Sequence, residues 1–275
     1  MADEGRAHRP RKRFGQHFLT DRRSLERIVE ALDPQPDDTV VEIGPGRGAL
    51  TSLLAARCRR LIAIEIDRDL VRLLQEQFQD RPGVEIVDGD ALETDWATLA
   101  GGAFLLAGNL PYYITTPLIF RILEHPMPQR AVLLVQREVA ERLVAAPGSG
   151  DYGALTVNVQ VAVTVRMISR VTAGAFNPKP KVDSAIVLLS PRNPQSLGAD
   201  EEKPFRRFVQ AVFGMRRKQM LRVVRELWIP AADDAGVVLS DAGIDPAARP
   251  ETLKPETFLL LYRGITRRHV RFMKT

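Results

Sequence analysis

Short apolar stretches alternate with amphipathic segments over the first half of the chain. The apolar stretches are bounded by Gly, Pro or charged residues and are too short for buried helices, so we predict strands at 39–43, 61–66, 84–87, 104–107 and 131–135. Between them, apolar side chains recur every three or four positions, which predicts helices at 24–32, 48–57, 68–79, 116–123 and 138–144. This alternation is typical of an α/β protein whose mostly parallel sheet is covered by helices on both faces.

The second half of the chain has a different pattern. Residues 182–189 alternate between apolar and polar and predict a late strand, added antiparallel to the sheet. A segment rich in Pro, Ser, Gly and charge follows, and helical patterns dominate beyond it, at 205–213, 219–227, 232–242 and 256–263. We therefore predict a basic arm at 1–20, a Rossmann-like domain at 21–190, a linker at 191–203 and a small helical domain at 204–275.

Composition excludes several classes of protein. No apolar run approaches the ~20 residues that span a bilayer, and the first residues are charged rather than apolar, so we expect a cytoplasmic protein. Cys58 is the only cysteine, which excludes an intramolecular disulfide and a cysteine-cluster metal site. The four histidines show no metal-ligand spacing, so we expect no metal.

Positive charge is clustered along the chain. The net charge is +5, and the segment from Lys203 to Arg225 contains many basic residues and no acid. Basic runs are most often solvated surface, but clusters at the start, middle and end without balancing acids fit a surface that follows phosphates.

A glycine-rich turn follows the first predicted strand of the sheet. Gly44-Pro45-Gly46-Arg47-Gly48 leads into a helix, so the backbone can approach a ligand closely and present helix N–H groups to it. Glu65 ends the next strand, where a carboxylate accepts hydrogen bonds from ribose hydroxyls, and Asp90 follows the third, where an acid commonly contacts an adenine amine. This combination is compatible with either NAD or S-adenosylmethionine.

The motif Asn109-Leu110-Pro111-Tyr112 favours the methyl donor. The Asn109 side-chain oxygen and the Leu110 carbonyl can accept both N–H groups of an exocyclic amine, while Pro111 stiffens the turn and Tyr112 offers a ring for stacking. Two such acceptors concentrate the lone pair of the nitrogen, as N-methylation of adenine requires. The alternative is a simple turn after a strand, since Asn and Pro are common turn formers.

Several motifs together resemble the KsgA family, the small-subunit ribosomal RNA adenine dimethyltransferases. The resemblance covers nearly the whole chain and is carried, in order, by Phe14–Leu19, Glu42–Gly46, Glu65–Asp67, Gly89–Leu92, Asn109–Ile114, Tyr152–Val157, Phe176–Ser184 and Phe213–Lys218. The sequence departs from the family at His17, where many relatives have Asn, and at Arg47, where many have Leu. Neither departure removes a catalytic group.

This resemblance implies a class I methyltransferase that dimethylates two adjacent adenines near the 3′ end of 16S rRNA during small-subunit assembly, and we expect it to act as a monomer. It implies that S-adenosylmethionine contacts His17, Leu19, Gly44, Gly46, Glu65, Asp90 and Asn109. It further implies that Phe176 faces the target base opposite Tyr112. For the RNA phosphates we expect contacts from Arg206, Arg207, Arg216, Arg217, Lys218 and Arg222.

Alternatives remain open at this point. Erm-type 23S rRNA methyltransferases share the glycine turn and an asparagine-led motif, and a small-molecule methyltransferase or a non-catalytic ribosome assembly factor are further possibilities. Phe176 has a plain alternative as a core aromatic, although the prolines after it indicate an exposed loop. Tyr113 has the alternative of simple packing, and we expect Asp67 to cap the following helix.

Overall fold

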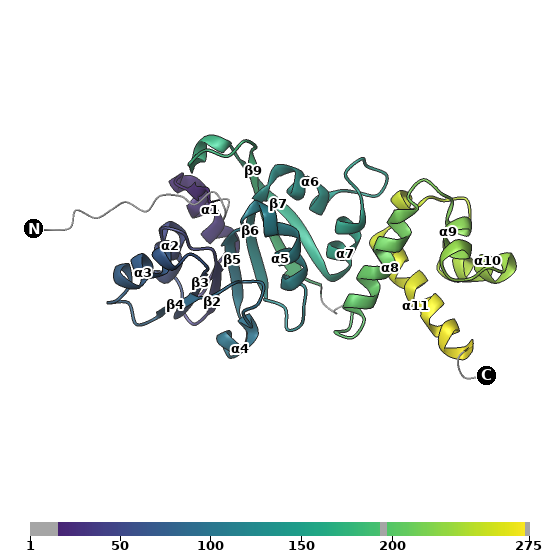
Figure 1. Ribbon diagram of the computed structural model, residues 1–275, viewed down its shortest axis with the longest axis horizontal. Coiled ribbons are helices and arrows are strands. Elements are labelled where there is room, and N and C mark those ends of the chain that lie inside the picture. Colours follow the sequence, from purple (N-terminus) through teal and green to yellow (C-terminus); the bar gives the residue numbers. More distant parts are fainter. Residues whose placement is uncertain (1–15, 193–196, 273–275) are drawn as a thin grey trace, which may run out of the picture. The chain divides into compact units, whose positions relative to one another are not determined.

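The computed structural model of the chain describes residues 16–192 and 197–272 (Figure 1). Their contacts divide into two units: the first holds the chain up to Ala140 together with Val165–Pro191, and the second holds Glu141–Thr164 and the chain from Arg192 onward. Residues 1–15 of the predicted arm and 193–196 of the predicted linker lie outside the described residues. Within the described ranges, no helix combines the length and the apolar character needed to cross a membrane.

The first unit is built on a seven-stranded sheet with the order β4-β3-β2-β5-β6-β9-β7. These strands are β2 (Thr39–Ile43), β3 (Arg60–Glu65), β4 (Val84–Asp88), β5 (Leu105–Asn109), β6 (Arg130–Gln136), β7 (Val163–Val171) and β9 (Ser184–Pro191). The neighbours from β4 to β6 are parallel, whereas β9 pairs with β6 in the antiparallel direction. The predicted α/β fold with a mostly parallel sheet and a late antiparallel strand is confirmed.

The sheet is buried on both faces, as expected for parallel strands joined by helices. Helices α1 (Arg22–Leu32) and α2 (Ala49–Ala55) contribute to the hydrophobic cluster on one face, where Val40, Leu105 and Val132 are buried. The alternate strand residues, such as Val41 and Leu106, are buried as well. The remaining helices of this unit are α3 (Arg68–Gln77), α4 (Trp96–Ala100), α5 (Thr115–Ile122) and the first half of α6 (Arg137–Val144).

Some elements lie outside the predicted set. A two-stranded antiparallel sheet joins β1 (Phe18–Leu19) to β8 (Phe176–Asn177), which are far apart in the sequence. Strands of two residues carry no detectable periodicity, so only the pairing of distant segments reveals them. The sequence pattern also missed α4 and the pair of α7 (Ala154–Ala162) and β7. In α7, apolar and polar residues alternate without a clear helical face, and the helix runs directly into the strand.

The second unit is helical and consists of α7, α8 (Glu202–Gly214), α9 (Met220–Leu227), α10 (Ala232–Asp241) and α11 (Pro255–Phe272). Aromatic side chains hold it together: the Phe208 ring stacks on Trp228 at 4.8 Å between centroids, and Phe205 meets Tyr262 edge-on at 5.6 Å. The small C-terminal helical domain is thus confirmed, although α11 is longer than the helix predicted at 256–263.

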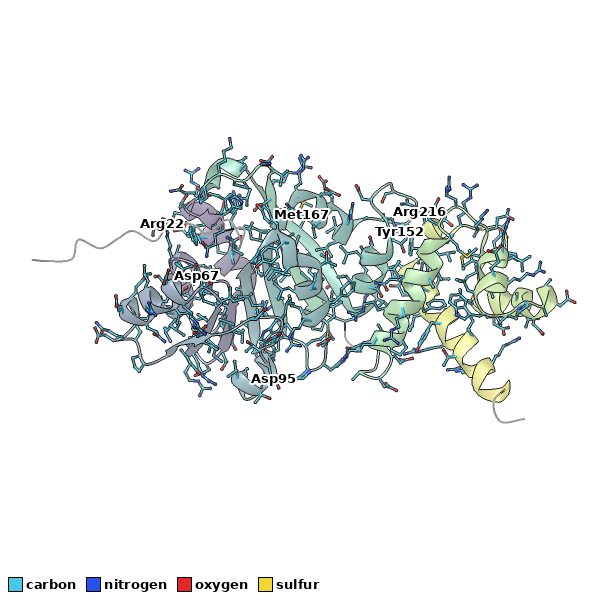
Figure 2. All side chains as sticks on the ribbon, viewed as in Figure 1. Arg22, Asp67, Asp95, Tyr152, Met167 and Arg216 are labelled. Carbon is cyan, nitrogen blue, oxygen red and sulfur yellow. The ribbon has the colours of Figure 1, made fainter. Side chains whose placement is uncertain are left out.

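The second unit also includes residues 141–164, which the sequence pattern assigns to the first domain. Tyr152, labelled in Figure 2, is fully buried, and its hydroxyl donates to the Leu253 carbonyl at 2.6 Å. Its ring also lies 6.2 Å from that of Phe213. Residues 141–164 therefore belong with the C-terminal helices, so the units do not coincide with the predicted ranges 21–190 and 204–275.

Candidate active site

The site lies at the carboxyl ends of β2 and β5, where the strand order reverses. Strand β2 is flanked by β3 on one side and by β5 on the other, so the loops that follow these strands diverge and leave a crevice. Gly44 follows β2 and Asn109 ends β5, and a Cβ at Gly44 would lie only 3.5 Å from the Asn109 carbonyl oxygen. The two motifs predicted to bind donor and acceptor therefore meet at one edge of the sheet.

A cavity with about 860 Å³ of empty space, its open mouth included, occupies this crevice. Of the residues predicted to bind the donor, only Leu19 does not line this cavity. The lining includes all the others: His17, Gly44, Gly46, Glu65, Asp90 and Asn109. The acceptor motif lines the same cavity through Leu110, Pro111 and Tyr112. The arrangement places a donor pocket and an amine-binding loop within one continuous space.

Gly46 brings the glycine turn against the N-terminal segment. Its backbone adopts φ +60°, and a Cβ built there would lie 2.8 Å from the Phe18 ring. Its N–H donates to Glu65 Oε2 at 3.2 Å. Glycine is required at this position both by the left-handed conformation and by the close approach of the ring.

We expect Gly46→Ala to raise the Kd for S-adenosylmethionine by about 10-fold or more, because left-handed backbone costs roughly 1–2 kcal/mol with a Cβ and the Phe18 ring has to move. Isothermal titration calorimetry measures this effect. Gly102→Ala is the matched control, since a Cβ at Gly102 meets nothing within 4 Å. Equal donor affinity in Gly46→Ala and Gly102→Ala would show that the turn does not hold the donor.

Glu65 ends β3 beside the glycine turn, and its side chain is well ordered by the backbone. Glu65 Oε1 accepts the N–H groups of Ile66 and Asp67, both at 3.0 Å. Burial raises the pKa of this carboxyl, and the backbone N–H groups oppose that shift. Backbone N–H groups therefore hold the carboxylate in place at the wall of the cavity.

Asp67 caps the following helix, as predicted. Its carboxylate accepts the backbone N–H of Asp69 at 3.2 Å and the side-chain amide of Gln16 at 3.0 Å. Figure 2 labels Asp67 at the beginning of α3. Glu65 thus lines the cavity, whereas Asp67 does not line it and serves as the N-cap of α3.

Two further residues line the donor side of the cavity. Ile66 and Tyr113 are 42% and 57% exposed, which is unusual for large apolar side chains, and both face this space. This exposure does not fit the alternative in which Tyr113 simply packs. Burial raises the pKa of the Tyr113 phenol, and the nearby carboxylates of Asp90 and Glu65 raise it further. The sequence could have indicated both positions as cavity residues, because Ile66 directly follows Glu65 and Tyr113 directly follows Tyr112.

The orientation of the Asn109 amide is determined by one hydrogen bond. Asn109 Nδ2 donates to the His17 carbonyl at 2.9 Å, and a carbonyl oxygen can only accept. The amide oxygen is consequently the group that remains for the cavity. In the adjoining turn, the Thr115 hydroxyl and the Ile114 N–H both bond to the Pro111 carbonyl.

Tyr112 is tied to two other segments of the first unit. Its hydroxyl lies 2.9 Å from Ser184 Oγ at the start of β9. The His17 ring stacks on the Tyr112 ring with centroids 5.7 Å apart and planes inclined by 27°. The phenol ring is thus anchored at its edge and covered on one face.

Phe176 does not have the exposed setting that its neighbouring prolines indicated. The ring is 5% exposed and belongs to the core cluster that also contains Leu19 and Ile186. Strand pairing with Leu19 holds the residue there. Phe176 therefore takes the core alternative, although residues 177–179 and 181–182 of the loop that follows are exposed. Neither Phe176 nor Leu19 lines the cavity.

The predicted RNA-contacting residues lie in and between α8 and α9 of the second unit. Arg216, labelled in Figure 2, pairs with Glu251 at 3.3 Å, and Arg222 pairs with Glu226. Arg207, Arg217 and Lys218 are exposed. Positive charge is therefore available on this unit, with part of it already neutralised by acids.

The cavity suits an adenosine-bearing methyl donor on several counts. The glycine turn leaves no Cβ between its backbone and a ligand, the carboxylates of Glu65 and Asp90 accept from ribose and amine, and Ile66 supplies an apolar surface. Across the described residues, no group of three or more His, Cys, Asp or Glu side chains is placed to hold a metal ion. The residues predicted to bind a donor and the motif at 109–112 thus line the same cavity.

Comparisons with known proteins agree on one family. The sequence profile of the family described as "Ribosomal RNA adenine dimethylase" matches residues 7–266. Ribosomal RNA small subunit methyltransferase A of Geobacter metallireducens is 42% identical over 267 residues, which cover 95% of this chain and 97% of that protein. The crystal structure of a dimethyladenosine transferase from Plasmodium falciparum is similar with a TM-score of 0.81 and 27% identity, covering 92% of this chain and 98% of that one. The crystal structure of the 23S rRNA methyltransferase ErmE is similar with a TM-score of 0.71 and 30% identity, covering 90% of this chain and 99% of that one.

Proposed function

The chain belongs to the ribosomal RNA adenine dimethylase family, and on this premise we propose its substrate and the roles of its residues. It is an rRNA adenine methyltransferase with the class I methyltransferase fold. We propose that it dimethylates the exocyclic amines of two adjacent adenines near the 3′ end of 16S rRNA, with S-adenosylmethionine as the donor.

The orientation of Asn109 is the observation that carries this proposal. An exocyclic amine has two N–H donors, and the amide oxygen of Asn109 is turned toward the cavity because its nitrogen is engaged by the His17 carbonyl. The Leu110 carbonyl is the proposed second acceptor. With both N–H groups held, the lone pair of the nitrogen is drawn out of conjugation with the ring and directed at an electrophile.

The donor side is assigned to residues of four loops. Glu65 binds the ribose hydroxyls, Asp90 binds the adenine amine, and the turn at Gly44 and Gly46 admits the rest of the molecule, next to His17. When bound, S-adenosylmethionine supplies an electrophilic methyl group on a positively charged sulfur. The motif at 109–112 lies against the same space, so this chain positions the nucleophile beside that methyl group.

The chemical step needs no strong base from the protein. The adenine nitrogen forms a bond to the methyl carbon while the carbon–sulfur bond breaks. The resulting positive charge on nitrogen makes its proton acidic enough to pass to water. The residues at 109–112 act by positioning, and stacking on Tyr112 contributes about 1–3 kcal/mol to holding the extruded base.

The second methylation makes a further demand on this loop. One N–H remains after the first transfer, so a methyl group has to fit where a donor had been. The same acceptors then hold the remaining N–H while the new methyl group occupies open space in the cavity.

For RNA binding we propose the basic residues of the second unit, with Arg217 and Lys218 as the most accessible. We expect the log of affinity to fall steeply with the log of salt concentration, since each phosphate contact releases counterions. The double variant Arg217→Ala/Lys218→Ala should lessen that slope by roughly 1.5, measured by filter binding across a salt series.

Arg57→Ala/Arg59→Ala is the matched control, because these exposed arginines lie between α2 and β3, at the opposite edge of the sheet from the cavity. It should leave the slope unchanged. A flat salt response of the unmodified protein would contradict phosphate binding, and equal slopes in the two double variants would remove Arg217 and Lys218 from the proposed surface.

The function itself is tested with labelled S-adenosylmethionine and particles from a strain that lacks this activity. Small-subunit particles, large-subunit particles and free nucleosides are offered separately, and the methylated nucleotides are mapped. Label in two adjacent adenines near the 3′ end of 16S rRNA supports the proposal. Label in 23S rRNA favours the Erm-type alternative, label in nucleosides a small-molecule methyltransferase, and no label a non-catalytic assembly factor.

The 16S assignment rests on the relative named for the small subunit, which is 42% identical, against 30% for ErmE. We further propose that the protein acts as a monomer on the small subunit or its precursor. Its proposed location is the cytoplasm, where bacterial ribosomal subunits assemble.

A further inference from the structure

One side chain connects the loops that form the acceptor side of the cavity. His17 lies in the segment before β1, and its ring stacks on Tyr112 from the segment after β5. Its Nδ1 lies 2.8 Å from the Pro178 carbonyl, directly after β8. Its own carbonyl receives the Asn109 amide. Three segments distant in sequence are thus joined through a single residue.

The hydrogen bond to Pro178 requires a proton on Nδ1 of the imidazole. A carbonyl oxygen only accepts, so Nδ1 carries the proton and donates it. The ring cannot turn about its bonds without losing this interaction. Both stacked rings are therefore anchored to one segment, His17 through Pro178 and Tyr112 through Ser184.

We propose that the His17 imidazole is a positioning residue for the target base. It covers one face of the Tyr112 ring and fixes its plane, which leaves the opposite face to stack on the adenine whose amine Asn109 holds. The inference rests on the proposed function and concerns its acceptor side. It gives His17 a role toward RNA in addition to its place along the donor pocket.

Phe176 does not perform this task in the structure, because its ring lies in the core. The aromatic group in contact with Tyr112 is His17 instead. Replacement of His17 by Asn would separate the two interactions of this side chain. Nδ2 of asparagine is bonded to Cγ just as Nδ1 of histidine is, so an Asn amide can reach Pro178, but it has no ring to stack.

Three variants separate the two interactions of this side chain. His17→Asn retains an N–H donor and removes the ring, His17→Phe retains a ring and removes the donor, and His17→Ala removes both. None of them alters the His17 carbonyl that orients Asn109. Each is assayed for donor affinity by calorimetry and for kcat and KM with unmethylated small-subunit particles, with a melting curve to verify folding.

We expect His17→Asn to raise KM for the particles by about 2- to 10-fold, the range of an aromatic pair, and to raise the donor Kd by a smaller factor than this. His17→Phe should stay closer to the unmodified KM, and His17→Ala should be the weakest. In a Tyr112→Leu background, His17→Asn should have no additional effect on KM, because the ring it supports is gone.

The inference would be overturned if His17→Asn lowered the KM, because the imidazole would then occupy the place of the base. It would also be overturned if the variants weakened donor and RNA binding in equal proportion, or if the effects of His17 and Tyr112 were additive. An unmodified protein that binds the donor but does not methylate 16S rRNA would refute the proposed function and this inference together. Activity that is indifferent to every His17 variant would refute the inference alone.

Discussion

Replacing Asn109 by alanine is expected to lower kcat/KM for rRNA by about 1000-fold, similar to the loss of a preorganised hydrogen-bonding group in other active sites. The donor Kd should rise by no more than about 10-fold, because the donor contacts proposed for Glu65 and Asp90, on other strands, remain. The reason for this separation is geometric. With Asn109 Nδ2 bonded to the His17 carbonyl, the amide oxygen is the group proposed to accept the amine.

Asn109→Asp distinguishes orientation from mere acceptor capacity. A carboxylate retains an oxygen for the amine, but it has no N–H for the His17 carbonyl, which lies 2.9 Å from the amide nitrogen. Two acceptor oxygens would face each other there, so the side chain should turn and lose its alignment. We expect a loss of activity close to that of Asn109→Ala.

Single-turnover methyl transfer and calorimetric titration of the donor provide the two measurements. If Asn109→Ala lost donor affinity and transfer rate by the same factor, Asn109 would be a donor ligand rather than the group that holds the amine. If Asn109→Asp retained full activity, the hydrogen bond to His17 would be irrelevant to catalysis.

The second large effect concerns stability, and we expect Glu42→Gln to remove most of the loss of stability between pH 5 and pH 8. Glu42 is the fourth of the five residues of β2, is 1% exposed, and its Oε2 has no hydrogen-bond partner among the described residues. Burial raises the pKa of this carboxyl to about 8, the neighbouring Thr51 side chain opposes the shift, and the nearby Glu65 adds to it.

The direction follows from proton binding in the two states. Above pH 4.5 the unfolded chain releases the Glu42 proton, whereas the folded protein retains it until the pH approaches its raised pKa of about 8. The folded state binds more protons throughout this window, so the free energy of unfolding falls as the pH rises. The total loss from this one group is on the order of a few kcal/mol.

Urea unfolding at pH 5, 6.5 and 8 measures the effect. Glutamine has the same shape and no charge. The free energy of unfolding of Glu42→Gln, relative to that of the unmodified protein, should therefore rise steadily toward pH 8. Glu93→Gln, at an exposed position, is the matched control and should follow the unmodified protein. Parallel curves for Glu42→Gln and the unmodified protein would mean that Glu42 is already ionised in the fold.

The local order of the elements was accessible from the sequence. The strands from β2 to β6 and the helices between them follow from periodicity, because burying one face of a helix or both faces of a strand requires a repeating pattern. The Glu65–Asp67 assignment was also accessible, since a carboxylate at a strand end and one at a helix start occupy predictable places. The motif Asn109–Tyr112 predicted its chemistry from the functional groups alone.

Tertiary structure alone decided which of these groups touch. The bond between Asn109 and His17 spans 92 positions and that between His17 and Pro178 spans 161, and no local pattern specifies either. The burial of Phe176 depends on strand pairing with Leu19, which overrides the exposure that its prolines indicated. The sequence by itself therefore predicted the strands from β2 to β6 and drew attention to the glycine turn and the motif at 109–112, through short-range periodicity and side-chain chemistry. The direction of the Asn109 amide and the partner of the Tyr112 ring depend on long-range packing, which only the folded chain establishes.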